Sequence, residues 1–240
     1  MICLDYLNIN VRVDVLDIDS AWEEWMKILT VQNKNDSSRD GDVVGEVINA
    51  VTVITNPINN IMKNKQRNLS IKYAIGEMLW YISGNNSLKE IQKYTSGWDR
   101  MSDDGKTVNS NYGWCIKNKY GFNQWEFVKQ ELTKNPNSRR AVIHIKEPTC
   151  KDSKDINCTI CLQFFIRNNK LYMTTYMRSN DIWTGFPYDV FQFTNIQILM
   201  SMELGIEVGE YTHIAGSLHL YKRDYDKWRK NNEHTCSCIE

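Results

Sequence analysis

The sequence has no long apolar run and no surplus of either charge. Its 240 residues include 29 Lys and Arg and 29 Asp and Glu, so the formal net charge is zero. Proteins that bind DNA or RNA polymers usually carry a basic excess, and a membrane-spanning helix needs about 20 apolar residues in succession. The first residues also lack the basic-then-apolar order of a signal peptide. We therefore expect a cytoplasmic protein (host cytoplasm if viral) that acts on neither nucleic-acid polymers nor membranes.

Glycine and proline are few, at 12 and 4, and no repeat, linker or low-complexity tract divides the chain. A single domain over residues 1–240 is expected. Seven cysteines at irregular spacing favour free thiols over a disulfide framework. Cys158 and Cys161 form a CxxC, but strand alternation would send them to opposite faces. The tail His234-x-Cys236-x-Cys238 has no second pair of matching spacing, so no metal site is predicted.

Hydrophobic periodicity predicts strands interspersed with helices, which is typical of an α/β or α+β fold. Helices are expected at 20–31 (with Asp19 or Ser20 as the N-cap), 70–83, 87–94, 123–134, 188–204 and the C-terminus. Strands are expected at 43–55, 141–146, 157–166, 170–178 and 210–221. Arg167-Asn168-Asn169 is a good hairpin turn. The polar, turn-rich residues 95–122 are predicted to form a loop.

Three side chains stand out, although each has a structural explanation. Cys158 opens a strand, where a lone Cys is more often an inert buried thiol. Glu77 is the only acid within an apolar helical stretch, a costly position unless the carboxylate is paired or used. Asp189 begins an apolar helix, where an acid stabilises the helix dipole. None of the three identifies a site alone.

Two polar clusters lie at the ends of predicted strands. Arg139-Arg140 is either a solvated surface pair or an anion clamp, because guanidinium groups bind phosphate oxygens bidentately. Arg178-Ser179-Asn180-Asp181 gathers a cation, a hydroxyl, an amide and a carboxylate, which favours a binding site over packing. Asp99, Tyr112, His219 and Tyr221 are individually uninformative.

Six motifs follow one another between about Ser37 and Tyr221: GEMLWYISG, GWDRMSDDG followed by NYG, NPNSRRAVIHI, CTICLQF, RSNDIWTGFPYD and GSLHLY. Taken in this order, they resemble the thymidylate synthase superfamily. The resemblance implies a large mixed β-sheet flanked by helices, with one sheet face at a homodimer interface. It also implies Cys158 as the nucleophile, Glu77 as the catalytic acid and Asp189 at the base.

The same resemblance implies the ligand contacts. Residues expected at the nucleotide are Arg39, Arg139, Arg140, Gln163, Arg178, Ser179, Asn180, Asp181, His219 and Tyr221. Residues expected near the folate are Trp98, Asp99 and Tyr112. The paired arginines are implied to reach across the dimer interface, and together with Arg178 they would bind the 5′-phosphate.

Two departures from the family pattern point to a subgroup. The residue after the nucleophile, usually His, is Thr159, and the base-reading residue, usually Asn, is Asp189. A carboxylate can accept a hydrogen bond from the N4 amino group of cytosine, which uracil lacks. Both features, with MRSND and GSLH, are similar to the dCMP hydroxymethylases of T-even bacteriophages, and Ser179 is similar to the deoxy-specific enzymes.

This resemblance implies an activity. A one-carbon unit from 5,10-methylenetetrahydrofolate would be transferred to C5 of dCMP through a Cys–C6 adduct, and water addition would give 5-hydroxymethyl-dCMP. The alternatives are thymidylate synthase or another C5-methylase acting on dUMP, a CMP hydroxymethylase, and an inactive nucleotide-binding homologue. The residues do not decide between water and hydride at the last step.

Overall fold

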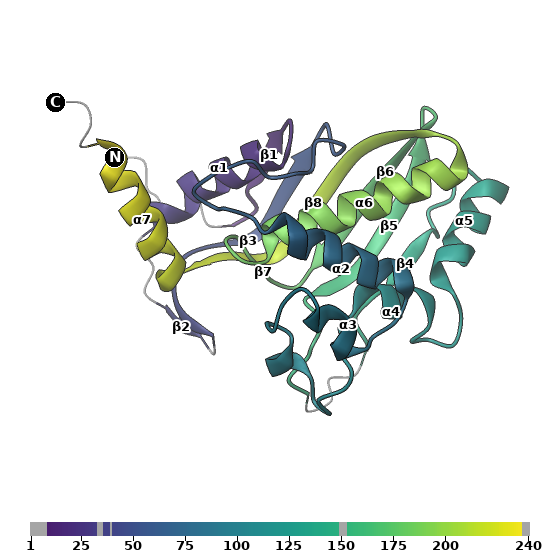
Figure 1. The fold of residues 1–240 in the computed structure, drawn as a ribbon. Helices are drawn as coiled ribbons and strands as arrows, with labels where there is room; N and C mark the ends of the chain where they lie inside the picture. The colour runs from purple at the N-terminus through teal and green to yellow at the C-terminus, as the bar shows by residue number, and fades with distance from the viewer. Residues whose placement is uncertain (1–8, 33–35, 39, 149–152, 237–240) are drawn as a thin grey trace.

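The computed structural model describes residues 9–32, 36–38, 40–148 and 153–236, with side chains up to residue 230. Arg39 and Cys238 lie outside the described residues, as do the side chains of His234 and Cys236. The fold is a mixed sheet flanked by helices, as the sequence predicts (Figure 1).

The sheet has the strand order β1-β3-β8-β6-β5-β4, with β2 added to β3 and β7 added to β8. The pairs β1–β3, β6–β8 and β7–β8 are parallel, and the other pairs are antiparallel. The strands are β1 (Arg12–Val15), β2 (Asp36–Ser38), β3 (Gly41–Ile54), β4 (Val142–His144), β5 (Thr159–Arg167), β6 (Lys170–Met177), β7 (Asn180–Asp181) and β8 (Glu207–Tyr221).

The helices lie mainly along one side of this sheet (Figure 1). They are α1 (Ile18–Thr30), α2 (Ile71–Ser83), α3 (Leu88–Gln92), the 3-10 turn η2 (Asp99–Met101), α4 (Tyr112–Lys117), α5 (Gln124–Lys134), α6 (Phe186–Leu204) and α7 (Lys222–Cys236). The long helix α6 packs on β6 and β8, and α1 packs on β1 and β3. No described helix has the length and apolarity needed to cross a membrane.

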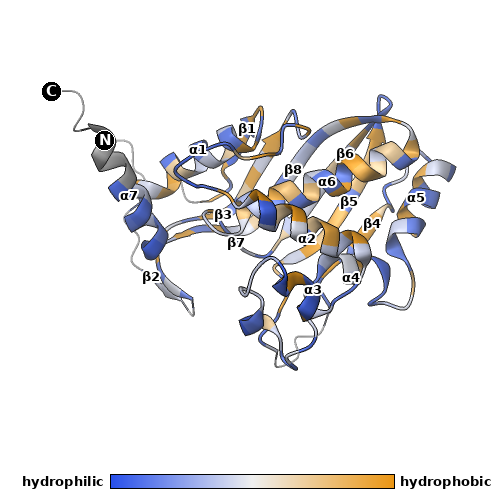
Figure 2. Ribbon diagram, viewed as in Figure 1, coloured by the Kyte–Doolittle hydropathy of each residue, from blue (hydrophilic) through white to orange (hydrophobic). Residues whose placement is uncertain are grey.

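Burial alternates along the central strands, because successive side chains point to opposite faces of a sheet. The inward positions join α1, α2 and α6 in the core, and Figure 2 shows hydrophobic residues concentrated on these strands and helices. The side chains on the opposite face of the sheet are only partly covered. Ile48 is 38% exposed and Ile160 is 40% exposed. One face of the sheet therefore packs on the helices while the other is partly open.

Two local predictions are corrected. Helix α1 begins after Asp17, whose side chain accepts a hydrogen bond from the Ser20 amide at 3.0 Å, so neither Asp19 nor Ser20 is the cap. The Asp19 carboxylate instead accepts from the backbone amides of Lys63 and Asn64, tying a later segment to the helix. Cys158 does not open a strand: it immediately precedes β5, which begins at Thr159.

The segment 95–122 is also not simply a loop, because it contains η2 and α4. Asn111 caps α4 by accepting from the Trp114 amide at 2.6 Å. The argument from strand alternation for Cys158 and Cys161 fails locally, because the β5–β6 register shifts between Thr159 and Cys161. The hairpin turn after Arg167 is confirmed, with Asn168 and Asn169 both left-handed at φ 51° and 58°.

Candidate active site

Cys158 lies where the ends of β5 and β6 meet. Antiparallel pairing of Thr159 with Met177 brings Cys158 opposite Arg178, whose amide donates to the Cys158 carbonyl at 2.8 Å. The Ser179 hydroxyl lies 3.9 Å from Cys158 Sγ. The thiol is half-buried and lies next to Arg178 and Ser179, the polar residues that follow β6. The nucleophile predicted from the sequence is thus directly beside the predicted phosphate-binding cluster.

The environment of Cys158 is less favourable to a thiolate than the sequence suggests. Burial raises the pKa of the Cys158 thiol, and the positive charge of Arg178 opposes this without reversing it. The Arg178 guanidinium donates to the backbone carbonyls of Asn157 and Ile156, both at 3.1 Å. Arg178 alone therefore does not favour the thiolate over the thiol, and activation of Cys158 calls for a proton acceptor or a change of surroundings.

Glu77 is held inside the protein by polar partners. It is 4% exposed, and its carboxylate accepts from the Tyr73 hydroxyl at 2.6 Å and from Gln192 Nε2 at 2.9 Å. Burial raises its pKa to about 7, although the hydrogen bonds from Tyr73, Tyr81 and Gln192 oppose the shift. A carboxyl group that titrates near neutral pH suits a residue that accepts and returns protons.

Asp189 sits in the first turn of α6, where the helix dipole favours the ionised form. Its pKa is nevertheless raised to about 8, first by burial and then by the charge of Glu77. Asn180 Nδ2 donates to Asp189 Oδ2 at 2.7 Å, and the Tyr112 hydroxyl lies 3.5 Å from Oδ1. The helix dipole therefore does not determine the pKa of Asp189, because burial and the nearby charge of Glu77 have larger effects.

Tyr112 links these three groups. Its hydroxyl receives a hydrogen bond from Thr159, the residue after Cys158, at 2.9 Å and faces Asp189. The charges of Asp189, Cys158 and Glu77 all contribute to the raised pKa of Tyr112, after burial. The nucleophile and the two acids predicted from the sequence thus lie around one buried tyrosine.

The other residues predicted near the folate lie at the Glu77 side. Trp98 Nε1 donates to the Tyr73 hydroxyl at 3.0 Å, and its ring meets Trp80 edge-on at 5.6 Å. Trp98 is half-buried, so one part of the indole faces solvent. Asp99 is exposed and accepts from Gln92 Nε2 at 2.9 Å. Tyr112 is separate from this pair, because it is buried against Phe193.

The predicted phosphate residues are not all gathered in one chain. Arg178 and Ser179 lie at Cys158, whereas Arg139 and Arg140 are exposed just before β4. β4 pairs Val142 with Gln163, which is five residues beyond Cys158, or on the order of 15 Å along a strand. Gln163 contacts the Arg139 carbonyl and the Tyr176 hydroxyl. Arg139, Arg140 and Gln163 therefore lie on a different part of the surface from Cys158 of the same chain.

Asp181, His219 and Tyr221 form a third group. Asp181 accepts from the backbone amides of Trp183 and Thr184, at 2.8 and 3.2 Å, and pairs with Arg223 at 3.4 Å. His219 meets the Tyr221 ring edge-on at 4.9 Å. The Asp181 carboxylate is thus occupied in shaping the turn between β7 and α6, which sets the position of Asp189.

Sequence reasoning missed the polar residues that support this site, namely Tyr73, Tyr81, Gln192, Tyr211 and His213. Tyr73 precedes Glu77 by four residues, a helical spacing that places both on one face. Gln192 follows Asp189 by three residues and is buried in an apolar helix. Both signals are visible in the sequence once the helices are assigned. The Tyr211 and His213 contacts depend on the sheet and have no such local signal.

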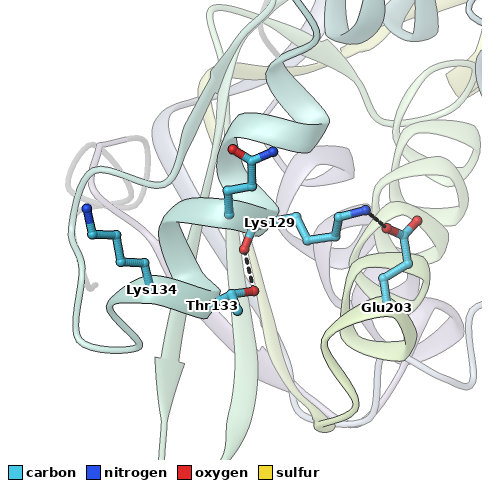
Figure 3. A pocket seen from close by; sticks show the side chains of 5 residues that line it. Lys129, Thr133, Lys134 and Glu203 are labelled. Atoms are coloured by element: carbon cyan, nitrogen blue, oxygen red, sulfur yellow. Dashed lines mark hydrogen bonds and ion pairs between the residues drawn. The ribbon is translucent and has the colours of Figure 1, made fainter.

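A metal site and a second pocket are the other ways in which a protein of this kind could hold a ligand. Among the described residues, no three His, Cys, Asp or Glu side chains are grouped to hold a metal ion. A pocket of about 640 Å³ lies between α5 and α6, lined by Lys129, Gln130, Thr133, Lys134 and Glu203 (Figure 3). Lys129 and Glu203 pair across it at 2.8 Å. This pocket contains none of the residues predicted to bind nucleotide or folate.

Comparison with known proteins decides the family. Residues 21–237 match the family described as Thymidylate synthase. The chain belongs to the thymidylate synthase family. Enzymes of this family use methylenetetrahydrofolate for one-carbon transfer to C5 of a pyrimidine nucleotide.

The chain is also similar to a phage enzyme and to a solved phage structure. The chain is 32% identical over 209 residues to the deoxyuridylate hydroxymethyltransferase of Bacillus phage SP01, covering 78% of this chain and 55% of that protein. The chain therefore spans about half the length of that relative. The crystal structure of thymidylate synthase from T4 phage matches with a TM-score of 0.74 at 18% identity, over 87% of this chain and 79% of the other. The structural likeness establishes the fold.

Proposed function

We propose that the chain is a deoxycytidylate 5-hydroxymethyltransferase that uses 5,10-methylenetetrahydrofolate. The observation that carries the proposal is the carboxyl group of Asp189 at the base-reading position of the family, close to Cys158 and Glu77. A pKa of about 8 keeps this group largely protonated at neutral pH. A protonated carboxyl offers one donor and one acceptor side by side.

That pair of groups suits cytosine. The base has an acceptor at N3 next to a donor amino group at N4, so one carboxyl oxygen can donate to N3 while the other accepts from N4. Uracil has a donor at N3 and an acceptor at O4, the reverse order. A base in a pocket is read through hydrogen bonds to this edge, and mismatched polar groups are left unpaired there.

The chemistry follows from three side chains. Cys158, once deprotonated, adds to C6 and leaves C5 electron-rich enough to attack an electrophile. The folate supplies that electrophile, a one-carbon unit at the oxidation level of formaldehyde. C5 would then lose its hydrogen as a proton, tetrahydrofolate would leave, and addition of water would let Cys158 depart from C6. Glu77, with a pKa of about 7, accepts or returns protons and orients the water that completes the hydroxymethyl group. Trp98 offers a flat, half-buried ring for the folate beside the Tyr73–Glu77 pair.

Arg178 and Ser179 next to Cys158 would bind the 5′-phosphate. Arg139 and Arg140 are exposed and precede β4, whose Val142 pairs with Gln163 rather than with the Cys158 end of β5, so we propose that they complete this clamp in a second copy of the chain. The partly open sheet face, which includes Ile160 and Phe165 of β5, would be covered in such a homodimer. Arg39, His219 and Tyr221 are proposed as further nucleotide contacts.

The phage relative favours a hydroxymethyl product over a methyl product, because it is named a hydroxymethyltransferase. Its name also specifies a uracil nucleotide, so the choice of cytosine rests on Asp189 and its surroundings. Deoxyuridylate hydroxymethylation is accordingly the second candidate function.

The test is to weigh the products. The purified chain is incubated with methylenetetrahydrofolate and, separately, with dCMP, dUMP or CMP. We expect dCMP to gain the mass of one formaldehyde unit at the highest rate. A uracil nucleotide converted faster than dCMP would overturn the base assignment, and gain of a methyl group would overturn the hydroxymethyl assignment. The Cys158→Ser variant, which keeps the shape of the site, is the matched control and should give no product.

A further inference from the structure

A chain of buried hydrogen bonds reaches Asp189 from the interior of the sheet. Tyr211 and His213 lie on β8, and the Tyr211 hydroxyl is 2.8 Å from His213 Nδ1. His213 Nε2 is 3.1 Å from Asn180 Oδ1, and Asn180 Nδ2 is 2.7 Å from Asp189 Oδ2. Tyr211, His213 and Asn180 are all at most 4% exposed. Only the last member of the chain, Asp189, is partly open to solvent.

The proton positions along this chain are linked. The Asn180 amide has its nitrogen at Asp189, so its oxygen faces His213 Nε2, which must carry the hydrogen. In a neutral imidazole, Nδ1 then accepts a hydrogen bond from the Tyr211 hydroxyl. Burial lowers the pKa of His213 to about 3, so the ring is neutral. The ring packs edge-on against Phe186 at 5.3 Å and lies 6.4 Å from the Phe193 ring.

The consequence falls on the two oxygens of Asp189. Asn180 donates to Oδ2 at 2.7 Å, whereas the Tyr112 hydroxyl reaches Oδ1 only across 3.5 Å, so Oδ2 is the stronger acceptor and a proton on the carboxyl group is favoured on Oδ1. Gly185 makes this contact possible, since a Cβ there would come 2.9 Å from Asn180 Nδ2 and 3.3 Å from Asp189 Oδ2. The carboxyl group thus presents its donor and its acceptor in one fixed order.

The geometry points to His213 as a positioning residue for base selection: through Asn180 it fixes which oxygen of Asp189 donates and which accepts. This inference rests on the proposed reading of the base by Asp189. It does not depend on whether cytosine or uracil is preferred. Selection of either base requires the donor and acceptor oxygens of Asp189 in a fixed order, and the binding preference is lost when that order is lost.

The test measures binding without turnover. In the Cys158→Ser background, the dissociation constants of dCMP and dUMP are measured by calorimetry, and their ratio is compared among variants. His213→Phe keeps an aromatic ring but removes the donor to Asn180, so we expect the ratio to move toward one by about tenfold, the effect of one hydrogen bond. His213→Gln restores an N–H group and should recover most of the ratio.

Two milder variants guard against misfolding. Gly185→Ala displaces the Asn180 amide without removing a polar group, and Tyr211→Phe frees the His213 tautomer, so both should reduce the ratio. The control is Thr52→Val. Thr52 lies opposite His213 on the same face of the sheet and accepts from Trp25 Nε1 at 2.8 Å, so it loses a buried hydrogen bond without touching Asp189. It should lower stability and leave the ratio unchanged.

The outcomes separate the two proposals. One outcome is a ratio of the dCMP and dUMP dissociation constants that changes in Asp189→Asn but stays within about twofold of the parent value in His213→Phe, Gly185→Ala and Tyr211→Phe. That result would overturn the role of His213 and leave base reading by Asp189 intact. An unchanged ratio in Asp189→Asn would overturn base reading and the role of His213 together. Equal loss in His213→Phe and His213→Gln would show a purely structural role and would also overturn the inference.

Discussion

The Tyr73 hydroxyl donates a 2.6 Å hydrogen bond to Glu77, one helical turn later on α2. This bond partly offsets the effect of burial on the acid, and it also connects Glu77 to the Trp98 indole. Tyr73 is therefore in a position to set the pH range over which Glu77 can accept a proton.

Tyr73→Phe removes a hydrogen bond that lowers the pKa of Glu77, so that pKa should rise further above about 7. The acid limb of the pH profile of kcat should move upward by up to about one pH unit, with the rate at neutral pH falling accordingly. The measurement is the pH dependence of kcat at saturating nucleotide and folate. Tyr120→Phe is the control, because its hydroxyl donates to the Ile145 carbonyl rather than to Glu77; a matching shift of the pH profile in that variant would refute the assignment.

The two raised carboxyl pKa values make stability depend on pH. Glu77 and Asp189 titrate near 7 and 8 in the folded protein, against ordinary values of 4.5 and 3.8. Between these limits the folded state binds more protons than the unfolded state, so the free energy of unfolding should fall as pH rises from about 4 to about 8. Urea unfolding across this range measures it.

Asp189→Asn removes one of these groups while keeping an acceptor for Asn180. The variant should therefore gain stability relative to the parent protein as the pH is raised, with the difference growing up to about pH 8. Asp99→Asn, which changes an exposed acid, should run parallel to the parent at every pH. A parallel curve for Asp189→Asn as well would contradict the buried-acid account.

Glu77, Cys158 and Asp189 each lie in a short stretch that is visible in the sequence, but each also has a structural explanation there. Their order along the chain, in the resemblance to the family, is what predicts a site. The contacts Thr159–Tyr112 and Asn180–Asp189 are different, since they appear only when β5, β7 and α6 pack together. The sequence does not predict helix α4, because that helix has only six residues and polar residues on both sides. Its close approach to the Tyr81 backbone depends on Gly113, where a Cβ would come 1.8 Å from the Tyr81 carbonyl oxygen.

The separation of Arg139 and Arg140 from their own Cys158 predicts sharing between subunits. Neither Cys158→Ser nor the double variant Arg139→Ala, Arg140→Ala should have full activity alone. When the two are mixed and exchange subunits, each hybrid dimer has one site with an intact Cys158 and intact partner arginines, so activity should return to about a quarter of the parent value. The measurement is product formation after refolding the mixture. Additive residual activities, without recovery, would place the arginines outside the site.

The most direct test of the account follows the hydrogen at C5. dCMP and dUMP, each carrying tritium at C5, are supplied at equal concentration with methylenetetrahydrofolate, and tritium release to water is measured for the parent, Cys158→Ser and Asp189→Asn. We predict release from dCMP in preference to dUMP, no release with Cys158→Ser, and a preference shifted toward dUMP with Asp189→Asn. Release by Cys158→Ser at the parent rate, or no release from either nucleotide by the parent, would contradict the account.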